Sequence, residues 1–277
     1  MRIAYQQVMG APEGDAWVLK YNQLLRKNID LVRSPDTEVE IRTLRKGVSR
    51  FDSMFYTYTN FLGFREILEG IIQAEKEGFD AVMICCFFDP ILKEARQAVN
   101  IPVIGPAEAA MHVAAMMGRK FGVITVSPTG AFDMEDNIVK YGLTTRATPI
   151  RPIPASPREQ MLAVEDFNQG LEPLRKVSRE LIQDGAEMIL PGCMVMSPVA
   201  RMAPGCPDLP NGIQEVDGVP VMDIVGVQLL MTEAMVRLKE AGSPWISRKG
   251  LYARPSGKAL ESALASLPYD GPGIWRS

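Results

Sequence analysis

Apolar and polar positions follow two periods along the first part of the chain. Residues 2–8 (RIAYQQV) and 37–44 (TEVEIRTL) are typical of strands, and residues 16–32 between them carry apolar side chains at helical spacing. An aromatic-rich stretch at residues 50–63 predicts a loop, and residues 64–78 predict an amphipathic helix. Strands separated by helices indicate an α/β fold with parallel sheets.

The second half of the chain repeats this order. In residues 78–86 (GFDAVMICC) and 185–193 (GAEMILPGC), a glycine precedes a cysteine by eight positions, across an apolar strand. Residues 120–126 (KFGVITV) mirror the opening strand, and an x-Pro-Val strand follows each cysteine segment, at 101–105 and 219–223. Because four elements recur in matching order, we infer two similar domains.

The predicted domains are not simple halves of the chain. The helix predicted at residues 226–242 is expected to pack back on the first domain and to make it discontinuous. We therefore expect residues 1–105 with 222–277 to form the first α/β domain, and residues 106–221 to form the second.

Composition and charge exclude several classes of protein. The chain has 277 residues, of which 47% are hydrophobic and 23% charged, as in an ordinary globular protein. Its net charge of -3 offers no basic surface for nucleic acid, and its longest apolar run, AVMICCFF, is too short to cross a bilayer. The N-terminus becomes polar at Gln6, unlike a secretion signal, so we expect a cytoplasmic location.

Cysteines carry most of the candidate chemistry. There are four, Cys85, Cys86, Cys193 and Cys206, and one histidine, His112, which leaves little material for histidine-based triads. In a reducing compartment the cysteines are expected to be thiols. Their spacing matches no zinc pattern, and no G-x-G-x-x-G follows the first strand, so the sequence implies neither a metal nor a dinucleotide.

Cys86 and Cys193 fall at the carboxyl ends of predicted parallel strands, where open α/β sheets bind ligands. Asp89 and Ser197, each followed by a proline, are expected to cap helices that start there. The amides and dipole of each helix would then favour a thiolate. A single strand cysteine is more often a small buried hydrophobe, but its recurrence at equivalent points of a repeat favours a chemical role.

The other two cysteines have simpler interpretations. Side chains alternate along a strand, so Cys85 should point away from Cys86 into the core. Cys206, in APGCPDLP, is expected to be a loop thiol without a role.

The sequence resembles a known family around these residues. The segments CFFDPILKEAR, IPVIGPAEAAMHVAA, KFGVIT and GAEMILPGCMVM are similar to the Asp/Glu/hydantoin racemase superfamily, and SRKGLYARP at 247–255 is similar to the end of its hydantoin racemase branch. The resemblance covers nearly the whole chain. It implies two flavodoxin-like domains with parallel sheets, related by a pseudo-twofold axis, with the active site in the cleft between them.

The resemblance also implies a racemase that needs no cofactor. One thiolate would take the proton beside a carbonyl of a hydantoin or amino-acid-like compound, and the other thiol would return a proton to the opposite face. Cys86 and Cys193 are the expected catalytic pair, and the amides after them would stabilise the enolate. The partners expected are a small-molecule substrate and further copies of the chain. The residues expected to contact the substrate are Gln7, Thr125, Phe87, Met194 and Val195.

The sequence departs from the family pattern close to these positions. Gln7 stands where hydantoin racemases have an asparagine, and Phe88 and Ile91 replace the two glycines of the usual FGDPG loop. Residues 51–59 are unusually aromatic, so Phe55, Tyr56 or Tyr58 could line the cleft or pack on their own domain. Glutamate racemases often have a histidine after the second cysteine, where this chain has Met194 and Val195, and this disfavours a histidine-assisted amino-acid racemase.

Secondary candidates have two interpretations each. Ser127 and Thr129 could contact the substrate or shape the loop SPTG, and Glu108 and His112 could orient the site or meet on a helix face.

Other functions stay open. A maleate-type cis-trans isomerase would use one cysteine as a nucleophile, and an arylmalonate-type decarboxylase usually works with a single cysteine. The alternative from a different class is a two-lobed small-molecule binding protein without catalysis. A redox role through a Cys86–Cys193 disulfide would need the cleft to close tightly.

Overall fold

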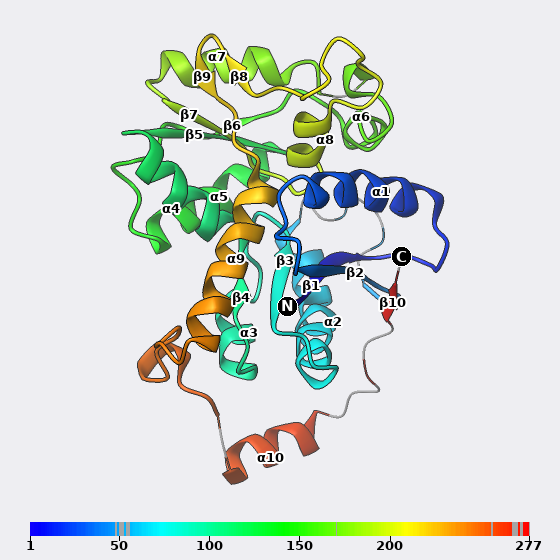
Figure 1. The fold of residues 1–277 in the computed structure, drawn as a ribbon, viewed down its shortest axis with the longest axis vertical. Coiled ribbons are helices and arrows are strands. Elements are labelled where there is room, and N and C mark those ends of the chain that lie inside the picture. The colour runs from blue at the N-terminus through cyan, green and yellow to red at the C-terminus, as the bar shows by residue number, and fades with distance from the viewer. Residues whose placement is uncertain are drawn as a thin grey trace.

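Two parallel sheets form the centres of two lobes that follow one another along the long axis of the molecule (Figure 1). The computed structural model describes residues 1–47, 49, 53, 56–169, 171–255, 257–267, 271 and 274–276. None of the described helices combines the length and apolar character that crossing a membrane requires.

The first lobe contains a sheet with the order β10-β2-β1-β3-β4, in which only the β10–β2 pairing is antiparallel among the described strands. Ile3 and Tyr5 of β1 belong to one core cluster, whereas Ala4 and Val8 belong to another, so the strand is buried on both faces. The elements before the second lobe are β1 (Arg2–Gly10), α1 (Ala16–Asp30), β2 (Glu38–Leu44), α2 (Thr57–Lys76), β3 (Ala81–Cys85), α3 (Leu92–Ala98) and β4 (Val103–Ile104).

The second lobe contains a sheet with the order β6-β5-β7, all parallel. A parallel bridge between Ile189 and Val221 extends it by one position beside β7. Its elements are α4 (Pro106–Met117), β5 (Phe121–Thr125), α5 (Pro128–Lys140), β6 (Arg151–Pro152), α6 (Pro157–Leu162), a 3-10 turn (Phe167–Gln169), α7 (Leu174–Gln183), β7 (Met188–Pro191), α8 (Met196–Met202), β8 (Glu215–Val216) and β9 (Val219–Pro220).

The strands of both sheets are arranged in the same order. In each, the first strand lies between the second and the third, and the fourth segment lies outside the third. This is the flavodoxin-like order, so the predicted α/β class with two similar parallel-sheet domains is confirmed. In such sheets the carboxyl ends of the central strands are the place where ligands bind.

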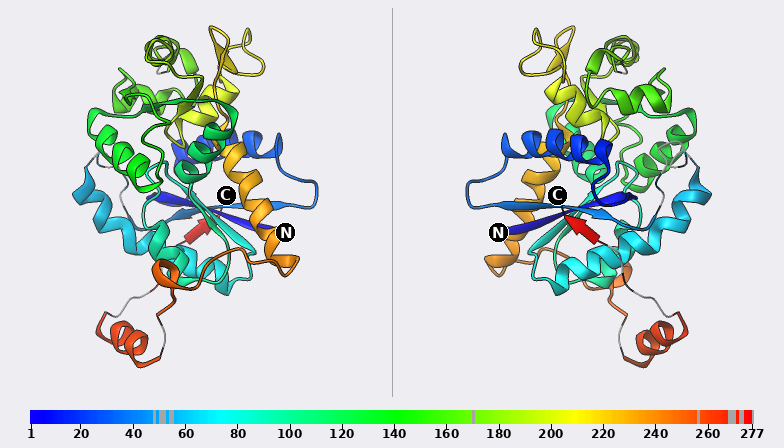
Figure 2. Two further views of the ribbon diagram at one scale, coloured as in Figure 1. Left: turned by 90° about the vertical axis from the view of Figure 1, so that its left-hand side faces the viewer. Right: turned by 90° about the vertical axis from the view of Figure 1, so that its right-hand side faces the viewer.

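The segment after the second sheet returns to the first lobe. The amide of Gln228 on α9 (Ile224–Glu240) donates to the carbonyls of Ile84 and Ile104, at 2.9 and 2.8 Å. A 3-10 turn (Gly250–Tyr252) and α10 (Gly257–Ser266) follow, and β10 (Ile274–Arg276) rejoins the edge of the first sheet. Figures 1 and 2 show that α10 stands away from both lobes. The exact domain boundaries given above stay a prediction.

One predicted loop is partly helical. α2 begins at Thr57, seven residues before the predicted start, so the second half of the aromatic stretch forms the first turns of this helix. Phe61 and Phe64 lie one helical turn apart, and their rings contact each other edge to face with centroids 6.0 Å apart. The aromatic content suggested a loop, but the spacing of the rings fits a helix.

Candidate active site

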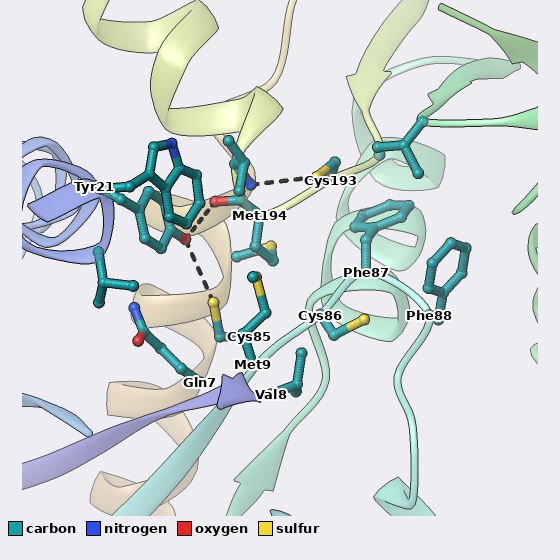
Figure 3. Close-up of a pocket in the computed structure, with 15 residues that line it drawn as sticks. Gln7, Val8, Met9, Tyr21, Cys85, Cys86, Phe87, Phe88, Cys193 and Met194 are labelled. Atoms are coloured by element: carbon teal, nitrogen blue, oxygen red, sulfur yellow. Dashed lines mark hydrogen bonds between the residues drawn. The ribbon is translucent and has the colours of Figure 1, made fainter. Parts of the chain in front are cut away.

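β3 and β7, the strands that lead to Cys86 and Cys193, end at one small cavity. Cys86 follows β3 directly, and Cys193 stands two residues after β7. Both thiols are partly buried, and both line the cavity, whose volume is about 70 Å³ (Figure 3). Its other lining residues come from both lobes: Gln7, Val8, Met9, Trp17, Val18, Tyr21, Cys85, Phe87, Phe88, Val126, Gly192, Met194 and Val195.

Cys85 and Cys86 point in opposite directions, as neighbours on a strand must (Figure 3). The sulfur of Cys85 lies 3.4 Å from the hydroxyl of Tyr21, which donates its own proton to the carbonyl of Met194 at 2.7 Å. Burial raises the pKa of the Cys85 thiol to about 11. Cys85 belongs to the core, as expected, but it also forms part of the cavity wall.

Backbone amides stabilise the negative charge of each candidate catalytic thiol. The N–H of Val195 donates to the sulfur of Cys193 at 3.3 Å, and the amide of Met196 acts in the same sense. Cys86 has the amide of Phe88 in this role. In both cysteine loops, therefore, the backbone amide two residues after the cysteine stabilises its thiolate.

Burial outweighs these amides. It raises the pKa of both Cys86 and Cys193 above the ordinary value for a thiol. The pKa of Cys86 is raised further by repulsion from the ionised forms of Cys193, Cys85 and Asp89. The prediction that helix amides would favour thiolates is therefore wrong for the resting protein, because desolvation is the larger effect at both sites.

The helices after the thiols do not begin where the sequence predicts. α3 begins at Leu92, after an N-cap at Ile91, and α8 begins at Met196 after an N-cap at Val195. The chain makes a turn between Cys86 and α3, so the first thiol does not lie directly before a helix. α8 begins three residues after Cys193, whereas α3 begins six residues after Cys86.

Asp89 and Ser197 cap helices other than the expected ones. The carboxylate of Asp89 accepts hydrogen bonds from the first amides of α4, those of Ala107 at 3.1 Å and Glu108 at 2.7 Å. The hydroxyl of Ser197 accepts one from Ile224 N–H, the first residue of α9, at 3.0 Å. Asp89 thus connects the first cysteine loop to α4, and Ser197 connects the second to α9. The prediction that each residue caps the helix next to it in the chain was therefore wrong.

A second and larger cavity adjoins the first. It has a volume of about 560 Å³ and lies between α2 of the first lobe and α5 of the second. The two cavities share the wall residues Val8, Cys86 and Phe88. Of the aromatic candidates, Tyr58 lines this second cavity, Tyr56 is exposed, and Phe55 lies outside the described residues.

Comparisons with known proteins place the chain in a family. The model of the Asp/Glu/hydantoin racemase family matches residues 20–232, which include both candidate catalytic thiols. A hydantoin racemase from Pseudomonas sp. (strain NS671) is 30% identical over 237 residues, or 84% of this chain and 86% of that protein. One from Rhizobium meliloti is 35% identical over 195 residues, or 70% of this chain and 73% of that protein. This chain belongs to the Asp/Glu/hydantoin racemase family.

Solved structures agree with this assignment. The allantoin racemase from Klebsiella pneumoniae is 27% identical, with a TM-score of 0.72 over 97% of this chain and 100% of that protein. A glutamate racemase from Francisella tularensis shares the fold, with a TM-score of 0.56 at 14% identity over 90% of this chain and 84% of that protein. The protein is therefore an isomerase of the racemase type.

Four of the five residues predicted to contact the substrate line the thiol cavity of this racemase. Phe87 follows Cys86 in the chain, and Met194 and Val195 follow Cys193, and all three line the cavity. Gln7 lines the cavity too, although both ends of its amide have protein partners: Nε2 donates to Asn22 Oδ1 and Oε1 accepts from Thr43 Oγ1, each at 2.6 Å.

The fifth, Thr125, is fully buried and lines neither cavity. A Cβ placed on Gly130 would lie 2.8 Å from Thr125 Oγ1 and 3.1 Å from Phe88 Cζ, so the hydroxyl and the ring crowd one stretch of backbone. The Thr125 hydroxyl has no hydrogen-bond partner among the described residues. Phe88, where the family usually has a glycine, thus fills space beside the hydroxyl that the resemblance places near the substrate.

Ile91, which stands at the other family glycine, has a backbone conformation that favours glycine. Its φ is +52°, in the left-handed region that β-branched residues rarely adopt, and its side chain packs on the core of the first lobe. The backbone of this loop therefore suits a glycine at position 91 whether or not a ligand lies close to it.

The remaining candidates lie apart from the thiols. Glu108 pairs with Arg96 at 2.5 Å and both line a third cavity together with His112, whose Nδ1 contacts the Glu108 carbonyl at 2.7 Å. Ser127 caps α5 by accepting from Gly130 N–H at 3.0 Å. Cys206 is a partly buried thiol that lines neither the thiol cavity nor the adjoining one.

The sequence interpretation missed Trp17 and Tyr21. They lie four residues apart on α1, stack at 5.5 Å and line the thiol cavity. Trp17 Nε1 also donates to the Met161 carbonyl of the second lobe at 2.9 Å. An aromatic pair at helical spacing beside the first strand was visible in the sequence, but the same pattern is typical of an ordinary core.

Proposed function

We propose that this racemase inverts the stereocentre of a 5-substituted hydantoin, or of a closely related neutral cyclic carbon acid, by proton transfer between Cys86 and Cys193. The observation that carries the proposal is that Cys86 and Cys193 line one cavity at the carboxyl ends of equivalent strands. The comparisons support it through relatives named hydantoin racemase and allantoin racemase.

The reaction needs two groups that each handle one proton. A thiolate takes the proton from the ring carbon, and the bonding electrons move toward the adjacent carbonyl to form an enolate. The opposite thiol then gives its proton to the other face of the carbon, so that one sulfur gains a proton and the other loses one. Exchange with water resets the pair, and the chemistry uses these two side chains without a cofactor.

Cys193 is the better candidate for the base in the resting protein. Two amides, from Val195 and Met196, stabilise its thiolate, whereas Cys86 has one, from Phe88. The ionised form of Cys193 also raises the pKa of Cys86, which keeps the second thiol protonated and ready to donate. The enantiomer that presents its proton to the second lobe would therefore react first.

The walls of both cavities favour a neutral ring over an anionic substrate. No Lys, Arg or His stands among the described residues that line them. A free amino acid, maleate or an arylmalonate would bring at least one carboxylate into a mostly apolar cavity without a cationic partner, which is costly. This argument ranks the amino-acid racemase, the cis-trans isomerase and the decarboxylase below the hydantoin racemase.

Deuterium exchange tests the proposal directly. Single enantiomers of 5-alkylhydantoins, allantoin and free amino acids are incubated with the protein in deuterated water, beside controls without protein for spontaneous exchange. We expect loss of optical activity together with one deuterium at the ring carbon of a hydantoin. Catalysed loss of CO₂ from an arylmalonate, or fumarate formed from maleate, without any hydantoin exchange would overturn the proposal.

A further inference from the structure

The larger cavity shares part of its wall with the thiol cavity. It runs between α2 and α5, and Cys86 and Phe88 belong to its wall as well as to that of the thiol cavity. The amide of Asn137 on α5 donates to the Phe88 carbonyl at 3.0 Å, which holds α5 against the first cysteine loop. A molecule that reacts at Cys86 can therefore extend directly into this space.

Volume decides which cavity holds the bulk of a substrate. The thiol cavity has a volume of about 70 Å³, well below the range of about 300–1,000 Å³ that is usual for small-molecule sites. The larger cavity, at about 560 Å³, falls within this range. The thiol cavity suits the reacting carbon, and the larger one suits the substituent that this carbon carries.

Aromatic side chains form one side of the larger cavity. Tyr58, Phe61 and Phe64 come from the first turns of α2, and Phe88 stands at the junction with the thiol cavity. Such rings pack against apolar chains, and their faces also attract cations.

Carboxylates stand on the opposite side. Asp133 and Asp136, three residues apart on α5, line the cavity with Asn137, and neither carboxylate has an ion-pair partner among the described residues. Burial and the neighbouring Asp136 raise the pKa of Asp133, so the two negative charges already oppose each other. A positive charge between them would relieve this repulsion.

We infer that the larger cavity is the subsite for the ring substituent, and that it selects a substituent with an apolar stem and a cationic end, such as an ammonium or guanidinium group. The stem would pass Phe88 and pack along Phe61 and Phe64, and the cationic end would meet Asp133 and Asp136. This inference rests on the proposed racemisation of hydantoins, because it assigns the substrate class of the same site.

The test compares substrates of equal length that differ only in terminal charge. The full-length protein is assayed for racemisation of 5-(4-aminobutyl)hydantoin, 5-pentylhydantoin and 5-(3-carboxypropyl)hydantoin. We expect kcat/KM to be highest for the ammonium compound and lowest for the carboxylate. Asp133→Asn and Asp136→Asn should each lower the ratio of ammonium to pentyl compound about threefold, and the double variant about tenfold, as expected for partly exposed charge pairs.

Glu135→Gln is the matched control. Glu135 is exposed on the same helix and lines neither cavity, so its substitution removes one charge from α5 and should leave the ratio unchanged. A pentyl compound that reacts as well as the ammonium compound, or a ratio that survives the double Asp variant, overturns the subsite. Failure of all three hydantoins to racemise would instead overturn the proposed function.

Discussion

The two cysteine loops of this racemase are copies in topology but not in electrostatics. Cys193 is followed within three residues by α8, and two amides of that segment stabilise its thiolate. Cys86 is followed by a turn that delays α3 to Leu92, and its thiolate has one amide and three repelling neighbours. The proposed reaction needs one proton acceptor and one proton donor at the same moment, and a repeat whose halves differ in this way would supply both.

The loops also differ in how they are anchored. In the first, the carboxylate of Asp89 accepts from the amides of α4 and from the Tyr141 hydroxyl, the latter at 2.6 Å. In the second, the neutral hydroxyl of Ser197 holds α9. The loop is thus connected to its helix by a carboxylate in the first half and by a neutral hydroxyl in the second. The stability of the first half should therefore depend on pH.

The sharpest way to separate the roles of the two thiols is to remove each in turn. Cys86→Ala and Cys193→Ala should each lower racemisation by about 10³-fold, because each removes one of two obligatory proton carriers. The remaining thiol can still exchange the proton on its own face, so Cys86→Ala should incorporate deuterium into one enantiomer without inversion, and Cys193→Ala into the other. Chiral chromatography with mass spectrometry measures both outcomes.

Cys206→Ala is the control for the loss of a thiol outside the cavity and should keep full activity. If either of the two cavity variants racemises at a near-normal rate, the two-thiol scheme is wrong. Exchange of the same enantiomer by both variants would show that the two sulfurs do not serve opposite faces.

The charged anchor should make stability depend on pH. Burial raises the pKa of Asp89 to about 6, above its value in an unfolded chain, so the folded state binds this proton more tightly. The resulting stabilisation is fully present below about pH 4, the unfolded pKa, and is lost as pH rises through about 6, which amounts to about 3 kcal/mol. Urea unfolding from pH 4 to pH 7 should show this loss in the parent protein and a flatter profile in Asp89→Asn.

Ser197→Ala serves as the neutral counterpart in the same titration. It should lower stability by the same amount at every pH and leave the slope between pH 4 and pH 7 as in the parent. An Asp89→Asn profile with the parent slope would mean that another group carries the pH dependence.

The sequence predicted what depends on local pattern and missed what depends on distant contacts. The repeated Gly-to-Cys spacing located both thiols, and the strand periodicity located the sheets, because these features are set by neighbours in the chain. The caps of Asp89 and Ser197 were misassigned, since their partners lie 18 and 27 residues away and are brought close only by the sheet order. Tyr21 was missed for the same reason, because its partner Met194 is 173 residues away.

The protonation state of the thiols in the resting protein also could not be predicted from the sequence. A helix after each cysteine suggested a lowered pKa, but the depth of burial outweighs the amides, and burial follows from the packing of both lobes. The motifs therefore identified two thiols that line one cavity, but the prediction misjudged their protonation.

Alkylation rates should rank the three thiols of the cavity. Cys193 should react with iodoacetamide about tenfold faster than Cys86 at pH 8, because it ionises first and the thiolate is the nucleophile. Cys85 is buried and its pKa is raised to about 11, so it should also react slowly and serves as a reference for a thiol that is limited by access. Peptide mass spectrometry over time gives the three rates, and repeating it from pH 7 to pH 10 separates ionisation from access, since access alone does not change with pH.

Ser197→Ala gives the smallest expected effect and tests whether the neutral anchor matters for catalysis. Losing one buried hydroxyl that accepts from the first amide of α9 should cost about 1 kcal/mol of unfolding free energy. Ser197 lies on α8, four residues after Cys193, so a loosened anchor should also let this thiol move relative to the amide of Val195. We expect slower alkylation of Cys193 and an unchanged rate at Cys86, with Ser197→Thr restoring both stability and rate. Equal changes at the two thiols would mean that the halves are coupled through the cavity and that their anchors do not act separately.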